Sequence, residues 1–362
     1  MNDTTNTNDV KNVVTIGIDI AKSIFQIHGS DKNGKKVFSI KVKRNELLKV
    51  IAKMPKCLIG MEACGGANYW AREIMSLGHE VKLMSPQYVK PYVKTNKSDR
   101  NDAAAIAEAV TRGSMRFVAI RTIAQQEIAA IHRVRSRLVK TSTMLQNQIR
   151  GIMAECGVIS GQGISALRKR LAEVLDEEAA SLPSIIKGLI KELNEELLNL
   201  VGRIKEITAQ LKARSQNEES CQRLESIPGI GPVTATALVA SVGDAKQFKN
   251  GRGLAAFCGL VPRQSSSGGK ERLLGISKRG NRYIRAMLVH GARAVVNASA
   301  GKEDGYSVWI QVLIERRGFN RAVVAVANKN ARIAWALLSR GENYKATDCA
   351  PQQNEERLAT VA

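Results

Sequence analysis

The sequence lacks the patterns that mark metal-binding or disulfide-bonded cysteines. Its six cysteines, at positions 57, 64, 156, 221, 258 and 349, include no Cys-x-x-Cys pair, and no histidine lies at ligand spacing from them. A zinc site or a disulfide framework is therefore not expected. We expect reduced and mostly buried thiols.

Long apolar runs are also missing. The longest, about residues 233–242, is far shorter than the roughly 20 residues that a transmembrane helix needs, and the N-terminus is polar rather than signal-like. These two absences predict a protein of its host's cytoplasm.

Acidic residues are scarce relative to basic ones. The 362 residues include 55 Lys or Arg and 33 Asp or Glu, which gives a formal net charge of +22. Such an excess indicates a polyanionic partner, and nucleic acid is favoured over membrane because no basic amphipathic helix with an aromatic edge is present. With 44% hydrophobic residues, the chain is long enough for two or three domains.

The first third of the chain has the pattern of a mixed α/β sheet. After a polar segment, 1–12, which we expect to be disordered, strands are predicted at 13–20, 24–29 and 36–42. A helix at 46–53, a strand ending at Glu62, a helix at 67–77 and a strand at 80–84 follow. Three antiparallel strands followed by alternating helices and strands correspond to the ribonuclease H-like order, in a domain spanning 13–120.

Four acids of this domain are candidate metal ligands. Asp19 and Glu62 each end an apolar strand, and Asp99 and Asp102 lie three residues apart on an Ala-rich helix for which Ser98 or Asn101 is a plausible N-cap. Taken alone, the Asp99–Asp102 pair is explained better by helix capping and by the helix dipole than by metal binding. Together, the four carboxylates form a donor set suited to hard divalent cations, as in two-metal phosphoryl transfer.

The middle of the chain, 121–218, is helical. Apolar residues recur at helical spacing over 125–156 and again from Pro183 to Leu211, with Ser181 or Ser184 near the second cap. We expect an antiparallel helical pair or coiled coil, either packed on its own chain or serving as an oligomerisation arm. The polar segment 215–220 is interpreted as a hinge.

Residues 224–235 match a helix-hairpin-helix. A Pro-Gly-Ile-Gly turn carries Gly229 and Gly231 and leads into a helix whose free N–H groups can hold a phosphate. This predicts contact with a nucleic-acid backbone, although such turns also occur as packing corners.

A basic region follows within a predicted C-terminal domain, 219–342. Between Pro262 and Arg340 there are 15 Lys or Arg and 4 Asp or Glu, and the candidate nucleic-acid contacts are Arg263, Lys270, Arg272, Lys278, Arg279 and Arg282. The run 265–269, Ser-Ser-Ser-Gly-Gly, taken alone is typical of a flexible linker. Trp309 and Trp335 are expected in the core, and the tail 343–362 is expected to be disordered.

Seven motifs in a fixed order resemble a DEDD transposase of the insertion-sequence family one hundred and ten. They are Gly-Ile-Asp-Ile-Ala-Lys (17–22), Gly-Met-Glu-Ala-Cys-Gly (60–65), Lys-Ser-Asp-Arg-Asn-Asp-Ala (97–103), Ile-Pro-Gly-Ile-Gly-Pro (227–232), Gly-Leu-Val-Pro-Arg-Gln (259–264), Ser-Ser-Gly-Gly-Lys (266–270) and Ser-Lys-Arg-Gly-Asn (277–281). The form around the serines is similar to the eleven-eleven subgroup.

The resemblance implies a RuvC-like domain, a coiled-coil arm and a C-terminal transposase domain. It implies that Asp19, Glu62, Asp99 and Asp102 bind Mg²⁺ and that Ser267 becomes covalently joined to DNA, with Ser266 as the alternative because three serines stand where the pattern usually has two. It also implies donor and target DNA, an element-encoded guide RNA and a homo-oligomer as partners.

Two other functions are alternatives to the transposase that the resemblance implies. A Holliday-junction nuclease would use the acids and the hairpin but no serine. A sugar-kinase-like ATPase would use Gly-Ile-Asp-Ile for phosphate binding. That function does not explain why the C-terminal half of the chain is basic.

Overall fold

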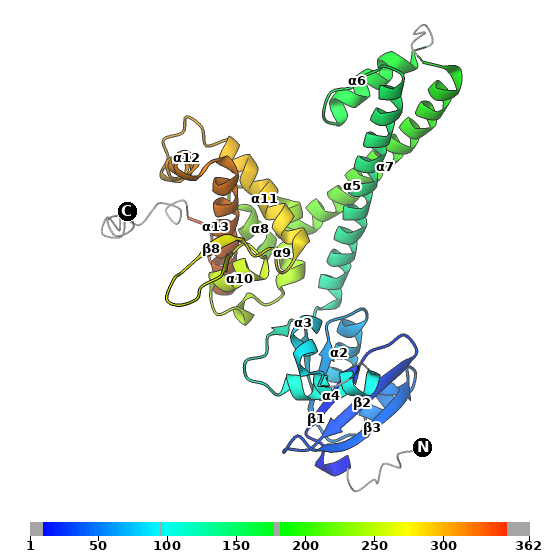
Figure 1. The fold of residues 1–362 in the computed structure, drawn as a ribbon, viewed down its shortest axis with the longest axis vertical. Helices are drawn as coiled ribbons and strands as arrows, with labels where there is room; N and C mark the ends of the chain where they lie inside the picture. The colour runs from blue at the N-terminus through cyan, green and yellow to red at the C-terminus, as the bar shows by residue number, and fades with distance from the viewer. Residues whose placement is uncertain (1–9, 95, 97, 177–181, 346–362) are drawn as a thin grey trace. The chain divides into compact units, whose positions relative to one another are not determined.

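The fold is described from a computed structural model, in which residues 10–94, 96, 98–176 and 182–345 are described (Figure 1). The chain divides into two compact units, Met1–Ile123 (unit 1) and Ala124–Ala362 (unit 2). Residues 10–12 of the segment expected to be disordered form a short 3-10 turn. The rest of that segment, and residues 346–362 of the expected C-terminal tail, lie outside the described residues.

Unit 1 is built on a six-stranded mixed sheet of order β3-β2-β1-β4-β5-β6. The strands are β1 (Thr15–Asp19), β2 (Ile24–Ser30), β3 (Lys36–Lys43), β4 (Leu58–Glu62), β5 (Glu80–Met84) and β6 (Phe117–Val118). Strands β1, β2 and β3 are antiparallel neighbours, whereas β1, β4 and β5 run parallel. The predicted three antiparallel strands followed by alternating helices and strands are confirmed, and the arrangement is consistent with an RNase H-like domain.

Helices cover both faces of this sheet (Figure 1). They are α1 (Leu47–Ile51), α2 (Ala67–Ser76), α3 (Pro86–Val89) and α4 (Asp99–Val110). Apolar residues of α1 and α2 share a core with Ile16, Ile18 and Phe25. Helix α4 packs on β1, β2 and β4 over the opposite face, because strand side chains alternate between faces and α4 lies against Gly17.

Two glycines let α4 approach the sheet. Gly17 and Gly60 are register partners on β1 and β4. A Cβ at Gly17 would lie 2.2 Å from the Ala103 carbonyl oxygen, and one at Gly60 would lie 2.8 Å from Val110 Cβ. Because neither strand has a side chain here, the alanine-rich helix rests directly on the strand backbones.

The first half of unit 2 is a helical arm. It contains α5 (Ile123–Glu155), α6 (Ile164–Leu175) and α7 (Ser184–Gln216). Helices α5 and α7 run antiparallel (Figure 1), because Arg214 near the end of α7 pairs with Glu127 near the start of α5. The apolar residues of α5 and α7 are buried against each other and against α6, so the predicted stripes pack within their own chain.

Two details of the arm differ from the sequence prediction. Helix α6 was not expected. The start of α7 agrees with the prediction, because Pro183 is the N-cap residue, without a side-chain hydrogen bond, and Ser184 follows it directly, while Ser181 lies outside the described residues. The predicted hinge at 215–220 is wrong, because α7 continues to Gln216 and Ser215 is fully buried, donating its hydroxyl proton to Glu225.

The second half of unit 2 consists of helices around one apolar core, with a β-hairpin at its surface. The helices are α8 (Glu219–Glu225), α9 (Pro232–Val242), α10 (Gly251–Phe257), α11 (Arg282–Asn297), α12 (Gly305–Arg317) and α13 (Phe319–Arg340), and the hairpin strands are β7 (Pro262–Gln264) and β8 (Leu273–Ile276). Helix α7 packs on α8 and α9. The arm therefore stays in one unit with these helices, whereas the sequence analysis separates them at 218/219.

No helix within the described ranges is long and apolar enough to cross a membrane.

Candidate functional site

Two of the four predicted acids end neighbouring parallel strands. Asp19 is the last residue of β1 and Glu62 the last of β4, and the register pairs the residues just before them, Ile18 with Met61. Both acids are half-buried. Each lies two residues beyond a glycine that faces α4, so both side chains start from the face of the sheet that α4 covers.

The other two acids occupy the first turn of α4. Ser98 is the N-cap, and its hydroxyl oxygen accepts a hydrogen bond of 3.3 Å from the Asn101 backbone N–H. Asp99 is exposed and Asp102 half-buried. Asp99 precedes by one turn Ala103, whose carbonyl oxygen lies against Gly17. The cap predicted at Ser98 is confirmed, and this turn belongs to the helix that covers the Asp19 face.

The carboxylates of Asp19 and Glu62 both affect the pKa of the Cys64 thiol. Burial raises the pKa of the Cys64 thiol above its ordinary value, and the carboxylates of Glu62 and Asp19 raise that pKa further. The edge of the sheet where β1 and β4 end is therefore an acidic environment. In the part of the chain that the structure describes, however, no group of three or more His, Cys, Asp or Glu side chains is gathered closely enough to hold an ion. Convergence of all four acids on a metal therefore stays a prediction.

A basic cavity in unit 1 was missed by the sequence analysis. It has a volume of about 760 Å³ and is lined by Lys22, Ser23, Ile24, Lys43, Arg44, Asn45, Tyr69 and Trp70. The guanidinium of Arg44 lies 5.0 Å from the centroid of the Trp70 ring. These residues come from three separate segments, so only Lys22, within the first motif, gave a sequence signal.

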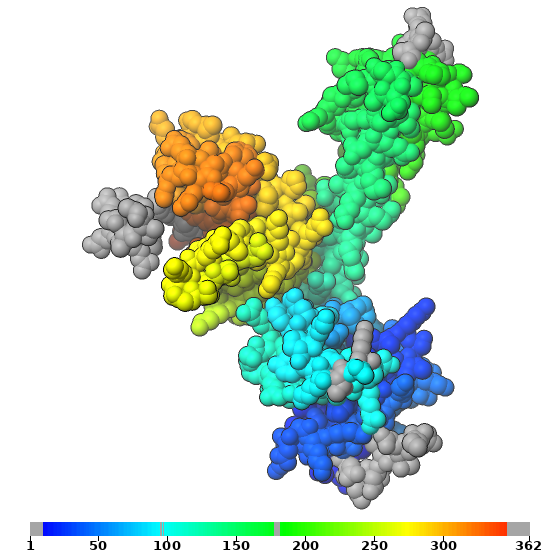
Figure 2. All heavy atoms as spheres, viewed as in Figure 1, coloured from blue at the N-terminus to red at the C-terminus, as the bar shows by residue number. Residues whose placement is uncertain are grey.

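The serine segment in unit 2 is a hairpin turn rather than a flexible linker. Gly268 and Gly269 have φ values of 55° and 77°, and the Lys270 N–H donates to the Ser267 carbonyl oxygen at 3.1 Å. Two successive positive φ values are typical of a type I′ turn, the tight connection of β-hairpins. Figure 2 shows this part of unit 2, in yellow, at the surface.

The two candidate serines differ in what their hydroxyls contact. The Ser266 hydroxyl oxygen accepts hydrogen bonds from the Gln264 side chain at 3.0 Å and from the Arg272 backbone N–H at 3.4 Å. The Ser267 hydroxyl makes no hydrogen bond within the described residues, and Ser267 is exposed. Within this hairpin, Ser266 therefore has a structural role, and the Ser267 hydroxyl is available to solvent.

The base of the hairpin is fixed by the loop that precedes α11. The N–H groups of Ser277 and Lys278 donate to the carbonyl oxygens of Val261 and Gly259 at 2.7 and 3.1 Å. All six predicted contact residues, Arg263, Lys270, Arg272, Lys278, Arg279 and Arg282, are exposed. The serine turn and these six cations are thus all exposed, on the hairpin, on the loop that follows it and at the start of α11.

The turn between α8 and α9 assigns different roles to its two glycines. Gly229 has φ 86° and packs against α11, where a Cβ would lie 2.8 Å from the Gly291 carbonyl oxygen. Gly231 is the exposed N-cap of α9, and a Cβ there would meet nothing within 4 Å. The packing-corner explanation therefore applies to Gly229, and open backbone is found at Gly231.

Few backbone donors remain available at the start of α9. Thr234 and Ala235 both donate to the Gly231 carbonyl oxygen at 2.9 Å, and Pro232 has no N–H. Within the described ranges, the N–H groups of Gly231 and Val233 make no hydrogen bond. These two groups are what this helix start can offer to a phosphate.

An RNase H-like sheet with acids at two strand ends, together with a cationic helical unit, defines a class of nucleic-acid-processing enzymes. Comparison with known families agrees. Residues 16–157 match a DEDD transposase model described as "Transposase", and residues 221–306 match the model "Transposase IS116/IS110/IS902 family".

Similar proteins cover nearly the whole chain. The chain is 49% identical over 336 residues to the transposase for insertion sequence element IS1111A of Coxiella burnetii, covering 93% of this chain and 92% of that protein. It is 48% identical to a probable family 20 transposase of Pseudomonas aeruginosa (92% and 99% covered) and 42% identical to the transposase for IS1328 of Yersinia enterocolitica (91% and 98% covered). The chain belongs to the IS110/IS116/IS902 family of DEDD transposases.

Proposed function

We propose that this transposase cuts and rejoins DNA through a covalent bond between Ser267 and a DNA phosphate. The observation that carries the proposal is the contrast within the hairpin, where Ser266 accepts two hydrogen bonds and the Ser267 hydroxyl, at an ordered exposed turn, accepts none from described residues. A nucleophile has to be free to reach its phosphorus atom, so Ser267 is favoured over Ser266.

The chemistry conserves the phosphodiester bond. The Ser267 oxygen attacks a backbone phosphorus, one P–O bond of the DNA breaks, and the departing deoxyribose oxygen takes up a proton in place of the one that Ser267 loses. Attack on the phosphoserine by a hydroxyl of another strand reverses these changes and joins the strands without ATP. Arg263, Lys270 and Arg272 are the cations nearest in sequence for neutralising the phosphate.

The acids Asp19, Glu62, Asp99 and Asp102 would hold the divalent metal that a DEDD domain suggests, and we propose Mg²⁺. Four carboxylates are oxygen donors of the kind this hard cation prefers, and two of them already act on one thiol, Cys64. When bound, the ion would supply charge stabilisation for the phosphate oxygens.

The partners are proposed from the family, the net charge and the sequence motifs. DNA follows from the transposase family, and the net charge of +22 suits a polyanion. The helix-hairpin-helix contact at Gly231, the coiled-coil function of the arm, a homo-oligomer and an element-encoded guide RNA are proposed from the motifs and the resemblance. Family membership does not favour the Holliday-junction nuclease.

The test is a trapped strand-transfer reaction resolved on a denaturing gel. Wild-type protein and the Ser266→Ala variant are expected to give a band of protein joined to DNA, and Ser267→Ala is expected to give none while still binding DNA. An adduct that survives Ser267→Ala and disappears in Ser266→Ala would move the nucleophile by one residue. An adduct that survives both changes would overturn the serine mechanism.

A further inference from the structure

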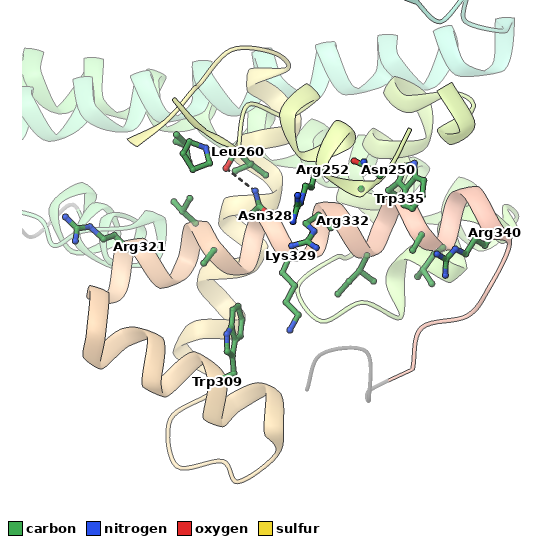
Figure 3. A pocket seen from close by; sticks show the side chains of 18 of the residues that line it. Asn250, Arg252, Leu260, Trp309, Arg321, Asn328, Lys329, Arg332, Trp335 and Arg340 are labelled. Atoms are coloured by element: carbon green, nitrogen blue, oxygen red, sulfur yellow. Dashed lines mark hydrogen bonds between the residues drawn. The ribbon is translucent and has the colours of Figure 1, made fainter. Parts of the chain in front are cut away.

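An open groove runs along α13 in unit 2 (Figure 3) and reaches the base of the serine hairpin, where Pro262 of β7 and Ile276 of β8 line it. Its volume is about 1150 Å³. Helix α13 forms the floor, with small apolar residues such as Ala325 and Ala336, and the start of α10 and Trp309 of α12 contribute walls. The motifs of the sequence analysis do not include its charged residues.

The charge of the groove is strongly positive. Five of the lining residues are cations, Arg252, Arg321, Lys329, Arg332 and Arg340, and one is an acid, Glu342, which lies 3.9 Å from Arg340. Arg252, Arg321 and Arg332 are exposed, and none of them forms an ion pair with a described residue. Figure 3 shows Arg252 and Arg332 close to one another at the middle of the groove, whereas the Lys329 side chain extends to the side of Trp309. Like charges placed so closely are stabilised by an anionic ligand.

Lys329 is held in place rather than left flexible. Its ammonium lies 4.5 Å from the centroid of the Trp309 ring and 5.3 Å from that of Tyr306, and the two rings are stacked. The Tyr306 hydroxyl donates to Asn330 at 3.3 Å, and the Asn330 side chain donates to the Pro228 carbonyl oxygen at 2.8 Å. This cation is therefore pre-positioned at low entropic cost for binding.

Three of the cations lie along one rigid element, α13. Arg321 and Arg340, with Arg332 between them, are 19 residues apart on one helix, a separation of about 28 Å along the axis at 1.5 Å per residue. That length corresponds to roughly eight nucleotides of a stacked strand at 3.4 Å each. Duplex DNA is stiff over this distance, so a duplex can lie along a rigid helix without bending.

The aromatic residues of the groove argue against a single strand. Proteins that bind single strands stack bases on open aromatic faces. Here the Trp335 indole N–H donates to the Ala245 and Phe248 carbonyl oxygens at 3.2 and 3.0 Å, and Trp309 is engaged by Tyr306 and Lys329. Among the described lining residues, both tryptophans thus have structural partners.

We infer that the α13 groove, which borders the base of the serine hairpin, binds the phosphate backbone of duplex DNA through cations that lie outside the hairpin and the α8–α9 turn. This inference rests on the proposed function, because it takes DNA as the partner, and it adds a second anchoring surface that fixes the duplex without reading its sequence.

The experiment measures the salt dependence of binding to a duplex of arbitrary sequence. The variant Arg321→Gln/Arg332→Gln is expected to lower the slope of log K against log salt by about 1.8, because each lost phosphate contact removes about 0.9. The matched control is Arg316→Gln/Arg317→Gln, which removes the same charge from exposed residues of α12 outside the groove and should leave the slope unchanged. If the groove pair lowers the melting temperature, Arg252→Gln replaces it, with an expected change of about 0.9.

Three results would overturn the inference. The first is an unchanged salt slope in the groove variant, and the second is an equal change in the groove and control variants. The third is a loss of binding in the groove variant that is seen with single-stranded RNA or polyglutamate as the ligand but not with duplex DNA. The covalent-adduct assay is independent of this measurement. A protein that forms the Ser267 adduct but shows no groove effect keeps the proposed function and loses only this inference.

Discussion

At the scale of single residues, the two glycines of the α8–α9 turn have different roles, one in folding and the other in the proposed binding of a phosphate. Gly229 is required by its positive φ and by the Gly291 backbone, whereas Gly231 borders open space. The sequence motif contains both glycines and cannot distinguish them, since the difference depends on α11, about 60 residues further along the chain.

Gly231→Val is therefore expected to weaken DNA binding by a similar factor for all sequences without changing the melting temperature. The added side chain blocks the approach of a phosphate to the N–H groups of Gly231 and Val233, and its Cβ would meet nothing within 4 Å. Affinities for several unrelated duplexes and a thermal melt check this. The matched variant Gly229→Ala should lower the free energy of unfolding by about 1–3 kcal/mol. Equal melting curves for the two variants would contradict the division of roles.

His132 gives unit 2 a predictable pH response. Its Nδ1 lies 3.0 Å from the Tyr283 hydroxyl and its Nε2 lies 3.1 Å from the Thr236 hydroxyl. Burial, and to a lesser degree the charge of Arg135, lowers the pKa of His132 from 6.5 to about 4. This buried imidazole is therefore neutral in the folded chain at pH values where the unfolded chain binds a proton.

The free energy of unfolding should consequently decrease as the pH falls from about 6.5 to about 4, because only the unfolded state gains the proton in that window. Urea titrations at a series of pH values measure this. His132→Gln keeps a side chain that can donate and accept but cannot titrate, so its stability should vary less over the same window. Identical pH dependence in both proteins would rule out His132 as the cause.

At the scale of secondary-structure elements, α4 is the part that brings an acidic turn to the acidic edge of the sheet. Its position depends on the paired glycines Gly17 and Gly60, over which the helix backbone lies. The helix itself follows from its Ser98 cap and its alanines, but its docking follows from the sheet.

Gly17→Ala should destabilise unit 1 by about 2 kcal/mol or more, since overpacking against backbone has no cheap relief. The new Cβ would lie 2.2 Å from the Ala103 carbonyl oxygen and 2.5 Å from the Ala107 nitrogen. Gly113→Ala is the control, because a Cβ there would meet nothing within 4 Å. Chemical denaturation of both variants checks the difference, and comparable midpoints would show that α4 is not held this way.

The sequence predicted most of the regular elements because their patterns are local. Strands β1 to β5 follow alternation or β-branched runs, and α5 and α7 follow long helical periodicity. Helix α6 was missed because its apolar positions, Leu167, Leu171 and Val174, cover only about two turns. The hairpin was missed because the Ser-Ser-Ser-Gly-Gly run has the composition of a flexible linker. The tight turn is recognised only from the positive φ values of Gly268 and Gly269.

At the scale of the whole molecule, function depends on groups that are distant in sequence. The four acids span residues 19 to 102, and the cations of the α13 groove come from residues 252 to 340. Ordered motifs made the acids and the serine predictable through the resemblance. The groove could not be predicted in this way, because Arg252, Arg321 and Arg332 belong to no shared motif and meet only after α10 packs on α13.

The covalent bond between Ser267 and DNA is tested most directly by mass spectrometry of the trapped adduct. Trypsin cleaves after Arg263 and Lys270, so residues 264–270 form one peptide that contains Ser265, Ser266 and Ser267. After nuclease digestion of the DNA, the account predicts a nucleotide mass on this peptide, with fragment ions that assign it to Ser267. A nucleotide found on Ser265, on Ser266 or outside this peptide, or an active recombination mixture without any adduct, would contradict it.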